Sequence, residues 1–436
     1  MFGKASVLLV LGFSIIFNVI GYNYVGLTAR SVENFSNYFT ETNAHNIAVS
    51  GANMAANQIF LSKVWGSGYT DLAFSGGIIN VTVDSNKLIK TVTSTGTYNG
   101  VSKVVKIILQ PSFFSKYGNF YSTISAQPAT GDTFNGPFHV NGTMYTYGTP
   151  VFWGKVTSKG TLSKSGSPKD PKFYGGYESG IDIPLEFDTT GMRNSAATGG
   201  KMFRDTTNTG KTIFVQLIYN TDGTVTHNFT INDGKKIWSP PITEPVATFA
   251  KNGIVYVEKG NIFTKGVIDQ KLTMVATRKG AGTLGSSDSL KTKIYSNTHY
   301  GGHINLIGDL QYKVDPKIDP VVDDMVGLVA EQDIRIVANN ENLGRDITSQ
   351  ASMFSLNGNI GPSDSLVNQP YLGKWNILGG MIAKTTRVTA KYGTVGGKTV
   401  PINGLSLVHR YDERFLLEVP PFFPNTRHYE VLSWYE

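Results

Sequence analysis

Residues 5–29 read ASVLLVLGFSIIFNVIGYNYVGLTA, and this stretch decides the fold because none of its side chains is charged. It lies between Lys4 and Arg30. About twenty such residues are enough to cross the hydrocarbon core of a bilayer as a helix. The alternative is a cleaved secretory signal, which usually ends in small residues of the A-x-A type, and none follows here. We therefore expect a retained membrane anchor, with the rest of the chain exported.

The helical pattern continues beyond Arg30, with apolar and small residues at helical spacing up to Ile59 and a Trp-Gly-Ser-Gly terminator from Trp65. A single helix over residues 5–64 is predicted, its first half in lipid or in a bundle of helices and its second half against a globular part. The residues expected to mediate assembly are the apolar ones of the first half: Val7, Leu8, Leu9, Leu11, Phe13, Ile15, Ile16, Phe17, Val19 and Ile20.

Three strand patterns follow the helix, over residues 77–83, 88–97 and 101–109. Tyr98-Asn99-Gly100 between the last two is a hairpin signal. We expect a small antiparallel sheet over residues 65–110 that packs on the helix. Residues 111–137, which carry aromatic, Gly and Pro residues, are interpreted as a linker.

The pattern of apolar and turn-forming residues changes at residue 138. Short apolar runs separated by Gly and Asn recur at intervals of roughly ten or twenty residues, which is typical of stacked coils. The prediction for 138–436 is a parallel β-helix (a solenoid), with a β-sandwich as the alternative and an inserted hairpin near 211–235. The fold class is thus mainly β with one long N-terminal helix.

Composition excludes several functions. The 436 residues contain no cysteine, so disulfides, thiol catalysis and Cys-ligated metal sites are absent from the chain. The net charge of +7 is spread singly along the sequence rather than in basic runs, so nucleic acid is not an expected partner.

Four parts of the chain carry a family likeness: the apolar helix after Gly3, residues 42–53, residues 93–100 and Tyr411-Asp412-Glu413-Arg414. In these parts the chain resembles type IV pilin-like proteins of the minor-pilin (PilX-like) kind. It implies a β-helical body behind a pilin helix and processing by cleavage between Gly3 and Lys4. Major pilins of this family have Glu at the fifth position of the mature helix, and that position here is Leu8. The departure favours a minor pilin or pseudopilin type.

Candidate chemical sites are few. His299 and His303 lie four residues apart, suitable for a metal, but the simpler interpretation is a glycine turn with surface histidines. The acidic cluster Asp309, Asp315, Asp319, Asp323 and Asp324 fits turn formers, a calcium loop, or acids of a polysaccharide lyase with Arg335 or Lys313 as base. Thr207–Thr212 matches only the end of a phosphate-binding loop. No catalytic, cofactor or metal residue is assigned.

Two functions follow. The first is a non-enzymatic pilin-like structural subunit of an extracellular filament, or a membrane-anchored surface protein of the cell envelope, which assembles through its N-terminal helix and displays a β-helical body with a role in adhesion. Its partners are other pilin-like subunits or copies of itself, with the inner membrane holding it before assembly. The alternative is a surface-tethered β-helix protein that binds or degrades glycans. The alternative draws on aromatic residues that can stack on sugars: Tyr145, Tyr147, Trp153, Phe173, Tyr174 and Tyr177.

Overall fold

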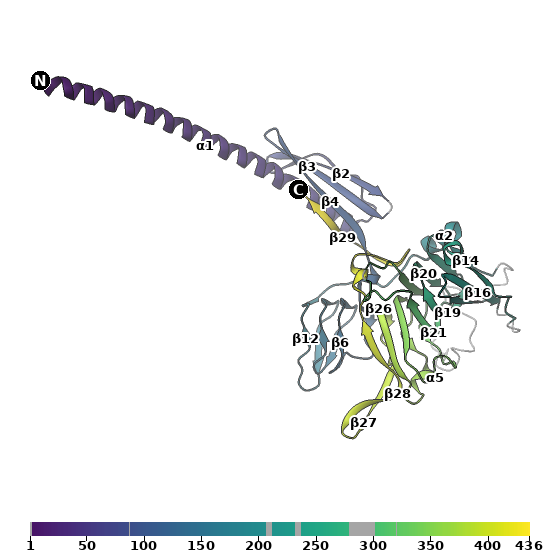
Figure 1. Ribbon diagram of the computed structural model, residues 1–436. Coiled ribbons are helices and arrows are strands. Elements are labelled where there is room, and N and C mark those ends of the chain that lie inside the picture. The colour runs from purple at the N-terminus through teal and green to yellow at the C-terminus, as the bar shows by residue number, and fades with distance from the viewer. Residues whose placement is uncertain (1, 87, 206–211, 232–236, 279–300, 320) are drawn as a thin grey trace. The chain divides into compact units, whose positions relative to one another are not determined.

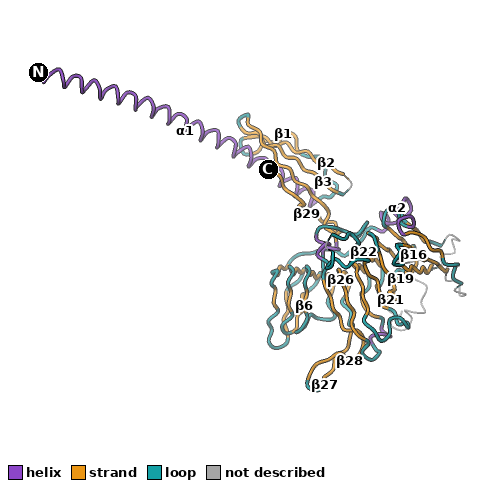
Figure 2. Tube along the Cα trace, viewed as in Figure 1, coloured by secondary structure: helices purple, strands orange, loops and turns teal. Residues whose placement is uncertain are grey.

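The computed structural model describes residues 2–86, 88–205, 212–231, 237–278, 301–319 and 321–436. The chain divides into two compact units. Unit 1 comprises residues 1–112 and 427–436, and unit 2 comprises residues 113–426. The chain is mainly β, with one long helix near its N-terminus and an antiparallel sheet in unit 1 (Figures 1 and 2).

Helix α1 (Phe2–Leu61) is the largest element of unit 1. Its 60 residues include no proline, which would remove a backbone donor and break the helix. Only its second half is packed: Ala44, Ile47, Ala48 and Ala52 are buried, whereas residues 3–11 and 13–39 are exposed. In Figure 1 the first half accordingly projects free of the sheet of unit 1.

The sheet of unit 1 has five strands in the order β1-β2-β3-β4-β29. The first four pair antiparallel with their sequence neighbours. The turn between β3 and β4 has positive φ at both Asn99 and Gly100, the geometry of a type I′ hairpin. The strands are β1 (Tyr69–Phe74), β2 (Gly77–Asn86), β3 (Ile89–Tyr98), β4 (Val101–Phe113) and β29 (Asn425–Tyr435).

Glycines allow α1 and β3 to approach closely. A Cβ atom on Gly96 of β3 would lie 2.3 Å from both the Ala44 carbonyl oxygen and the Ala48 backbone nitrogen. On the helix side, a Cβ on Gly51 would lie 2.5 Å from the Ser94 hydroxyl. The core between helix and sheet therefore combines small residues of the helix, such as Ala48 and Ala52, with Ile47 and Ile59 of the same helix and with branched residues of the sheet, such as Val92.

Unit 2 contains a continuous ladder of parallel strands in the order β14-β18-β20-β22-β24-β26-β5-β7-β10-β13. The alternate side chains of these strands point into one core, which includes Phe138, Val156 and Met274. The strands are β5 (Asn119–Thr123), β7 (Phe138–Val140), β10 (Val156–Ser158), β13 (Tyr177–Ser179), β14 (Lys201–Phe203), β18 (Ile254–Val257), β20 (Lys271–Ala276), β22 (Met325–Ala330), β24 (Ile347–Ser355) and β26 (Gly373–Thr385).

A second parallel ladder joins β15 (Ile213–Tyr219), β19 (Gly260–Ile268), β21 (Ile304–Tyr312), β23 (Ile334–Ile336) and β25 (Ile360–Pro362). The remaining strands of unit 2 form three further sets of parallel pairs, and three strands pair antiparallel at the edges of the ladders. These are β6 (Thr133–Phe134) with β9 (Val151–Phe152) and β12 (Lys172–Phe173), β8 (Met144–Tyr147) with β11 (Leu162–Ser165), β26 with β28 (Lys398–Arg410), and the antiparallel β16 (Thr224–Ile231), β17 (Ile242–Pro245) and β27 (Ala390–Val395).

The order of strands along the first ladder differs from their order in the sequence. Strand β26, late in the chain, pairs with β5, the first strand of unit 2. Strands β13 and β14 follow one another in sequence but lie at opposite ends of the ladder. Residues 180–188 and α2 (Thr189–Gly199) connect them; Ile183 and Met192 of this connection pack with Phe354 of β24 in one cluster. Asp188 caps α2 by accepting hydrogen bonds from two backbone N–H groups.

Short helical elements complete unit 2: α3 (Val246–Phe249), α5 (Asp364–Val367), η1 (Phe114–Lys116) and η2 (Glu413–Leu416). The structure differs from the sequence-based division at two places. Residues 111–137 contain β5 and β6 rather than a plain linker. Residues 427–436 belong to unit 1, not to the domain predicted over 138–436, because β29 is the neighbour of β4 in the sheet.

Candidate assembly surface

The first half of α1 exposes a large apolar surface. All ten residues assigned to assembly are exposed, from 52% for Ile16 to 72% for Leu8. Soluble monomers rarely expose a continuous apolar patch of this extent, because such surface is costly to hydrate. By length and composition, α1 meets the requirements of a membrane span. This part of the helix therefore needs lipid or protein around it.

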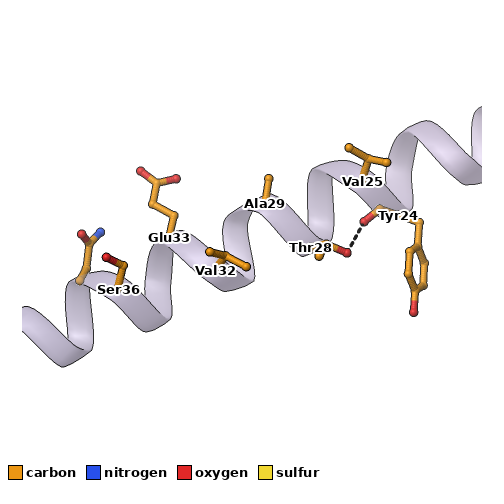
Figure 3. A pocket seen from close by; sticks show the side chains of 8 residues that line it. Tyr24, Val25, Thr28, Ala29, Val32, Glu33 and Ser36 are labelled. Carbon is orange, nitrogen blue, oxygen red and sulfur yellow. Dashed lines mark hydrogen bonds between the residues drawn. The ribbon is translucent and has the colours of Figure 1, made fainter.

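A shallow groove runs along α1 just beyond this apolar stretch. It is lined on one side of the helix by Val25, Thr28, Ala29 and Val32, with Tyr24, Glu33, Ser36 and Asn37 at its margins. In Figure 3 the Thr28 hydroxyl donates to the Tyr24 carbonyl oxygen, at 2.8 Å. The threonine is thus satisfied within its own helix, which is how polar residues are tolerated on membrane helices.

The expected cleavage pair, Gly3 and Lys4, lies in the first turn of α1 and is exposed. A Cβ on Gly3 would have no heavy atom within 4 Å. Nothing in the fold therefore requires glycine at this position. Whether the chain is processed there stays a prediction.

The acidic cluster does not form one site. Asp309 pairs with Arg345 at 2.6 Å and accepts from the Thr348 backbone N–H at 2.7 Å. Asp315 and Asp319 each accept a hydrogen bond from the backbone N–H two residues later, as turn formers do. Asp324 is buried, which raises its pKa. Within the described part of the chain, no group of three or more His, Asp or Glu side chains is arranged to hold a metal ion.

The two basic residues considered as proton acceptors are also engaged. Lys313 pairs with Asp269 at 2.5 Å, and this hydrogen bond raises the pKa of the lysine. Arg335 is buried, with its Nε 3.7 Å from the Asp333 carboxylate. Neither side chain is a free base facing the acidic residues of the turn.

His303 belongs to a polar ladder that sequence reasoning did not detect. The Asn261 side-chain oxygen accepts from the His303 backbone N–H at 3.0 Å, and His303 Nδ1 accepts from the Asp333 N–H at 3.3 Å. The Asp333 carboxylate continues the pattern by accepting from the Asn359 N–H at 2.9 Å. Each side chain thus binds the backbone beside the next strand of the second parallel ladder. His299 lies outside the described residues.

Burial lowers the pKa of His303 well below its ordinary value, and nearby Arg335 acts in the same direction. The ring is therefore neutral, with its proton on Nε2 so that Nδ1 can accept. The Asp333 carboxylate lies 3.5 Å from Nδ1. The neutral ring therefore connects neighbouring strands of the second ladder, and its Nδ1 is already used by the hydrogen bond from the Asp333 N–H.

A second buried histidine, His227 of β16, forms a cluster with Glu244 of β17 and Lys201 of β14. His227 Nε2 lies 2.9 Å from Glu244, and Glu244 also accepts from Lys201 at 3.1 Å. Burial lowers the pKa of His227. Burial alone would raise the pKa of Glu244, but its hydrogen bonds to His227 and Lys201 outweigh this effect and lower it. The imidazole side chain is only 5% exposed and packs on Phe249, so a substrate has no access to it.

The aromatic residues of unit 2 stack on one another. Phe134, Phe152 and Phe173 form an inner column with ring centroids 5.0 Å apart at each step. Outside, Trp153 and Tyr174 stack at 4.5 Å. Because one face of each ring is covered by the other ring, only the second face of each is left for stacking on a sugar. Tyr145 and Tyr147 are exposed, whereas the Tyr177 hydroxyl lies 2.8 Å from the Ser158 hydroxyl.

The segment compared with a phosphate-binding loop, Thr207–Thr212, lies outside the described residues except for Thr212. Most of the chemical groups described above are engaged in structural interactions. Among the described residues, the first half of α1 is exposed along its whole apolar stretch. The functional surface that the residues support best is a surface for assembly or membrane insertion.

Comparisons with known proteins find similarity among solved structures alone. No family model matches the sequence, and no curated protein matches it. A solved structure, the competence-associated pilin ComZ from Thermus thermophilus, is similar over 91% of this chain and 97% of that chain, with 12% sequence identity and a TM-score of 0.32. At that score, neither the fold nor the function of this chain is inferred from the likeness.

Proposed function

We propose that the chain is a non-enzymatic, pilin-like structural subunit of the cell envelope, anchored in a membrane or built into a filament through α1. The observation that carries this proposal is the exposure of every apolar side chain over residues 7–20 of α1. The second half of the same helix is the core element of unit 1, so a force or contact on the apolar half is transmitted to a folded unit without a flexible joint.

The length of the apolar stretch supports insertion into lipid. The uncharged residues 5–29 would extend about 37 Å along a helix at 1.5 Å per residue, slightly more than a hydrocarbon core of about 30 Å. Tyr22 and Tyr24 lie near one end of this stretch, where aromatic side chains favour the membrane interface. Lys4 and Arg30 flank it. We infer that residues 5–24 lie in the bilayer before assembly.

We infer further that unit 2 is a parallel β-helix displayed outside the membrane. The paired strands β5, β7, β10 and β13 occur 18 to 21 residues apart, a coil length suited to a solenoid. Their inward residues stack in columns, as the Phe134, Phe152 and Phe173 rings do. A crystal structure in which these four strands belonged to separate sheets would contradict this inference.

A charge in the middle of the apolar stretch tests the anchoring role. Aspartate at the centre of a membrane helix costs about 3 kcal/mol, or on the order of a hundredfold in partitioning. The full-length Phe13→Asp variant is expected to leave the carbonate-washed membrane fraction. Asn37→Asp adds the same charge to an exposed position of the same helix beyond the stretch and is expected to remain bound.

The proposal fails if the full-length protein is soluble and monomeric without detergent, or if both variants partition alike. Electron microscopy of purified material then distinguishes the two forms of assembly: filaments indicate a subunit, and vesicles covered with protein indicate an anchor. Release of sugars from acidic polysaccharides by the purified chain would instead support the enzymatic alternative.

A further inference from the structure

We propose that one face of α1, formed by Leu11, Ser14, Asn18, Gly21, Val25, Thr28 and Val32, is the contact surface for a second copy of the same helix. The two copies pack in parallel, within the membrane as far as Gly21 and beyond its surface from Val25 to Val32, with Asn18 opposite Asn18. We call this face the seam. The inference rests on the proposed insertion of α1 and adds the identity of its partner and the register of the contact.

The spacing of the seam is that of a left-handed coiled coil. Its members are separated alternately by three and four residues from Leu11 to Val32, an exact heptad pattern over three repeats. Leu11, Asn18, Val25 and Val32 occupy the a positions of this pattern. Branched aliphatic residues and a single asparagine at a positions are characteristic of parallel two-stranded coils.

Asn18 supplies the specificity of the proposed contact. Its side-chain amide donates one hydrogen bond to the Ser14 carbonyl oxygen, at 3.1 Å. The amide also has a second donor hydrogen and a carbonyl oxygen, which have no hydrogen-bond partner among the described residues. In hydrocarbon, an amide without partners is costly. Two Asn18 side chains facing each other satisfy this need, because asparagine is both donor and acceptor.

Small residues allow the two helices to approach. The d positions between the a residues are Ser14, Gly21 and Thr28. A Cβ on Gly21 would have no heavy atom of its own chain within 4 Å, so the chain's own fold does not require glycine there. Small residues at such positions are characteristic of close contacts between membrane helices. Over residues 9–20 the opposite side of α1, with Leu9, Phe13, Ile16 and Ile20, is apolar and suits lipid, and Asn23 follows on this side near the end of the inferred span.

The fold leaves the seam accessible. Val25, Thr28 and Val32 line the groove of Figure 3, so the seam continues into a concave part of the helix surface. At 100° per residue, Val32 lies about 120° around the helix axis from Ala44, which faces the sheet of unit 1. The next a residue, Phe39, packs against Tyr98 with ring centroids 6.3 Å apart, so the seam ends at Val32.

The partner is a second copy because the seam is complementary to itself. Copies inserted by the same route cross the membrane in the same direction, so their helices are parallel. In a parallel pair, each residue of the seam meets its own counterpart, and Asn18 meets the one residue at that depth that offers both a donor and an acceptor.

Cysteine cross-linking of the full-length protein in membranes tests this inference, since the native chain contains no cysteine. Ser14→Cys and Val25→Cys place a thiol on the seam. Ile16→Cys and Leu27→Cys place one at nearly the same depth on other sides of the helix. Under mild oxidation we expect disulfide-linked dimers from the seam variants at no less than ten times the yield of their controls.

Asn18→Leu in the Val25→Cys background tests the polar contact. Hydrogen bonds between membrane helices contribute a factor of roughly three to ten in association, so the dimer yield should fall by about that factor. Equal yields from all four cysteines, or no effect of Asn18→Leu, overturn the inference. If these results occur while the chain stays in the membrane fraction, the anchoring role stands; if the chain leaves the membrane, both proposals fail.

Discussion

Replacing Gly96 by alanine tests the closest contact between α1 and its sheet. The added Cβ would lie 2.3 Å from the Ala44 oxygen and the Ala48 nitrogen, and 2.9 Å from the Ile47 carbonyl carbon. An ordinary contact begins near 3.4 Å. Because all three atoms belong to the helix backbone, no side chain can rotate away, and helix and strand must separate by about 1 Å.

Such a separation affects the whole interface. A gap of 0.5–1 Å removes about a quarter to a half of the dispersion energy across it, and overpacking of a core costs about 1–3 kcal/mol. We expect Gly96→Ala to destabilise unit 1 by about 3 kcal/mol, the upper end of that range, because Ala48, Ala52 and Ala55 are all fully buried in the same core.

Hydrogen exchange on the full-length protein in detergent measures this loss. The amides of residues 44–59 and of β3 should exchange about a hundredfold faster, the factor that 3 kcal/mol corresponds to. Gly100→Ala is the control: Gly100 lies in the adjacent turn at positive φ, which Gly96 does not have, and no heavy atom lies within 4 Å of an added Cβ there. It should cost only about 1 kcal/mol of strain. If Gly96→Ala is the milder of the two, the close approach is not limiting.

Two further predictions concern unit 2. Trp375 is fully buried, and its indole N–H donates to the Ser349 hydroxyl at 3.0 Å. Trp375→Ala should therefore lower the free energy of unfolding measured in urea by about 3–5 kcal/mol. Trp153→Ala, at an exposed position, should lower it by about 1 kcal/mol or less, and equal losses would contradict the packing described. The pKa of His303 in the folded protein is lowered below 6.5, so at acidic pH unfolding takes up a proton. The contribution of this residue to the free energy of unfolding is therefore complete above pH 6.5. It is lost as the pH falls below that value, by up to about 1.4 kcal/mol per pH unit for one histidine. His303→Gln should reduce the dependence of the urea midpoint on pH between 7 and 5, and an unchanged dependence would show that this ring does not control it.

The long helix and the sheet on it could be predicted from the sequence because both follow local rules. A stretch without charge and without proline indicates a helix, and alternation with an Asn-Gly turn indicates a hairpin. Two strands of the sheet were missed. Strand β1 carries Asp71 at positive φ and a shift in register, so its side chains do not alternate between buried and exposed. Strand β29 joins the sheet from the far end of the sequence, and no local pattern indicates a partner so remote.

The polar ladder of unit 2 could not be predicted for a related reason. Its members Asn261, His303, Asp333 and Asn359 are separated by 42, 30 and 26 residues, since segments of different length connect the paired strands. A fixed period would have revealed the ladder, and an irregular one conceals it. The acidic residues show the converse: Asp309 and Asp315 are near in sequence, yet Asp309 pairs with Arg345 and Asp315 forms a turn with the Lys317 N–H. The β-helix itself stays a prediction, supported by the parallel pairings.

The pairing of β26 with β5, and of β29 with β4, has a consequence for biogenesis. The ribosome makes β5 more than 250 residues before the strand that shelters its edge. Until then, the early parallel strands present an open row of backbone donors and acceptors, which invites pairing with neighbouring chains. A nascent molecule released before its last segment would lack the final strand of unit 1 as well, so both units are completed only when the last residues of the chain have been made.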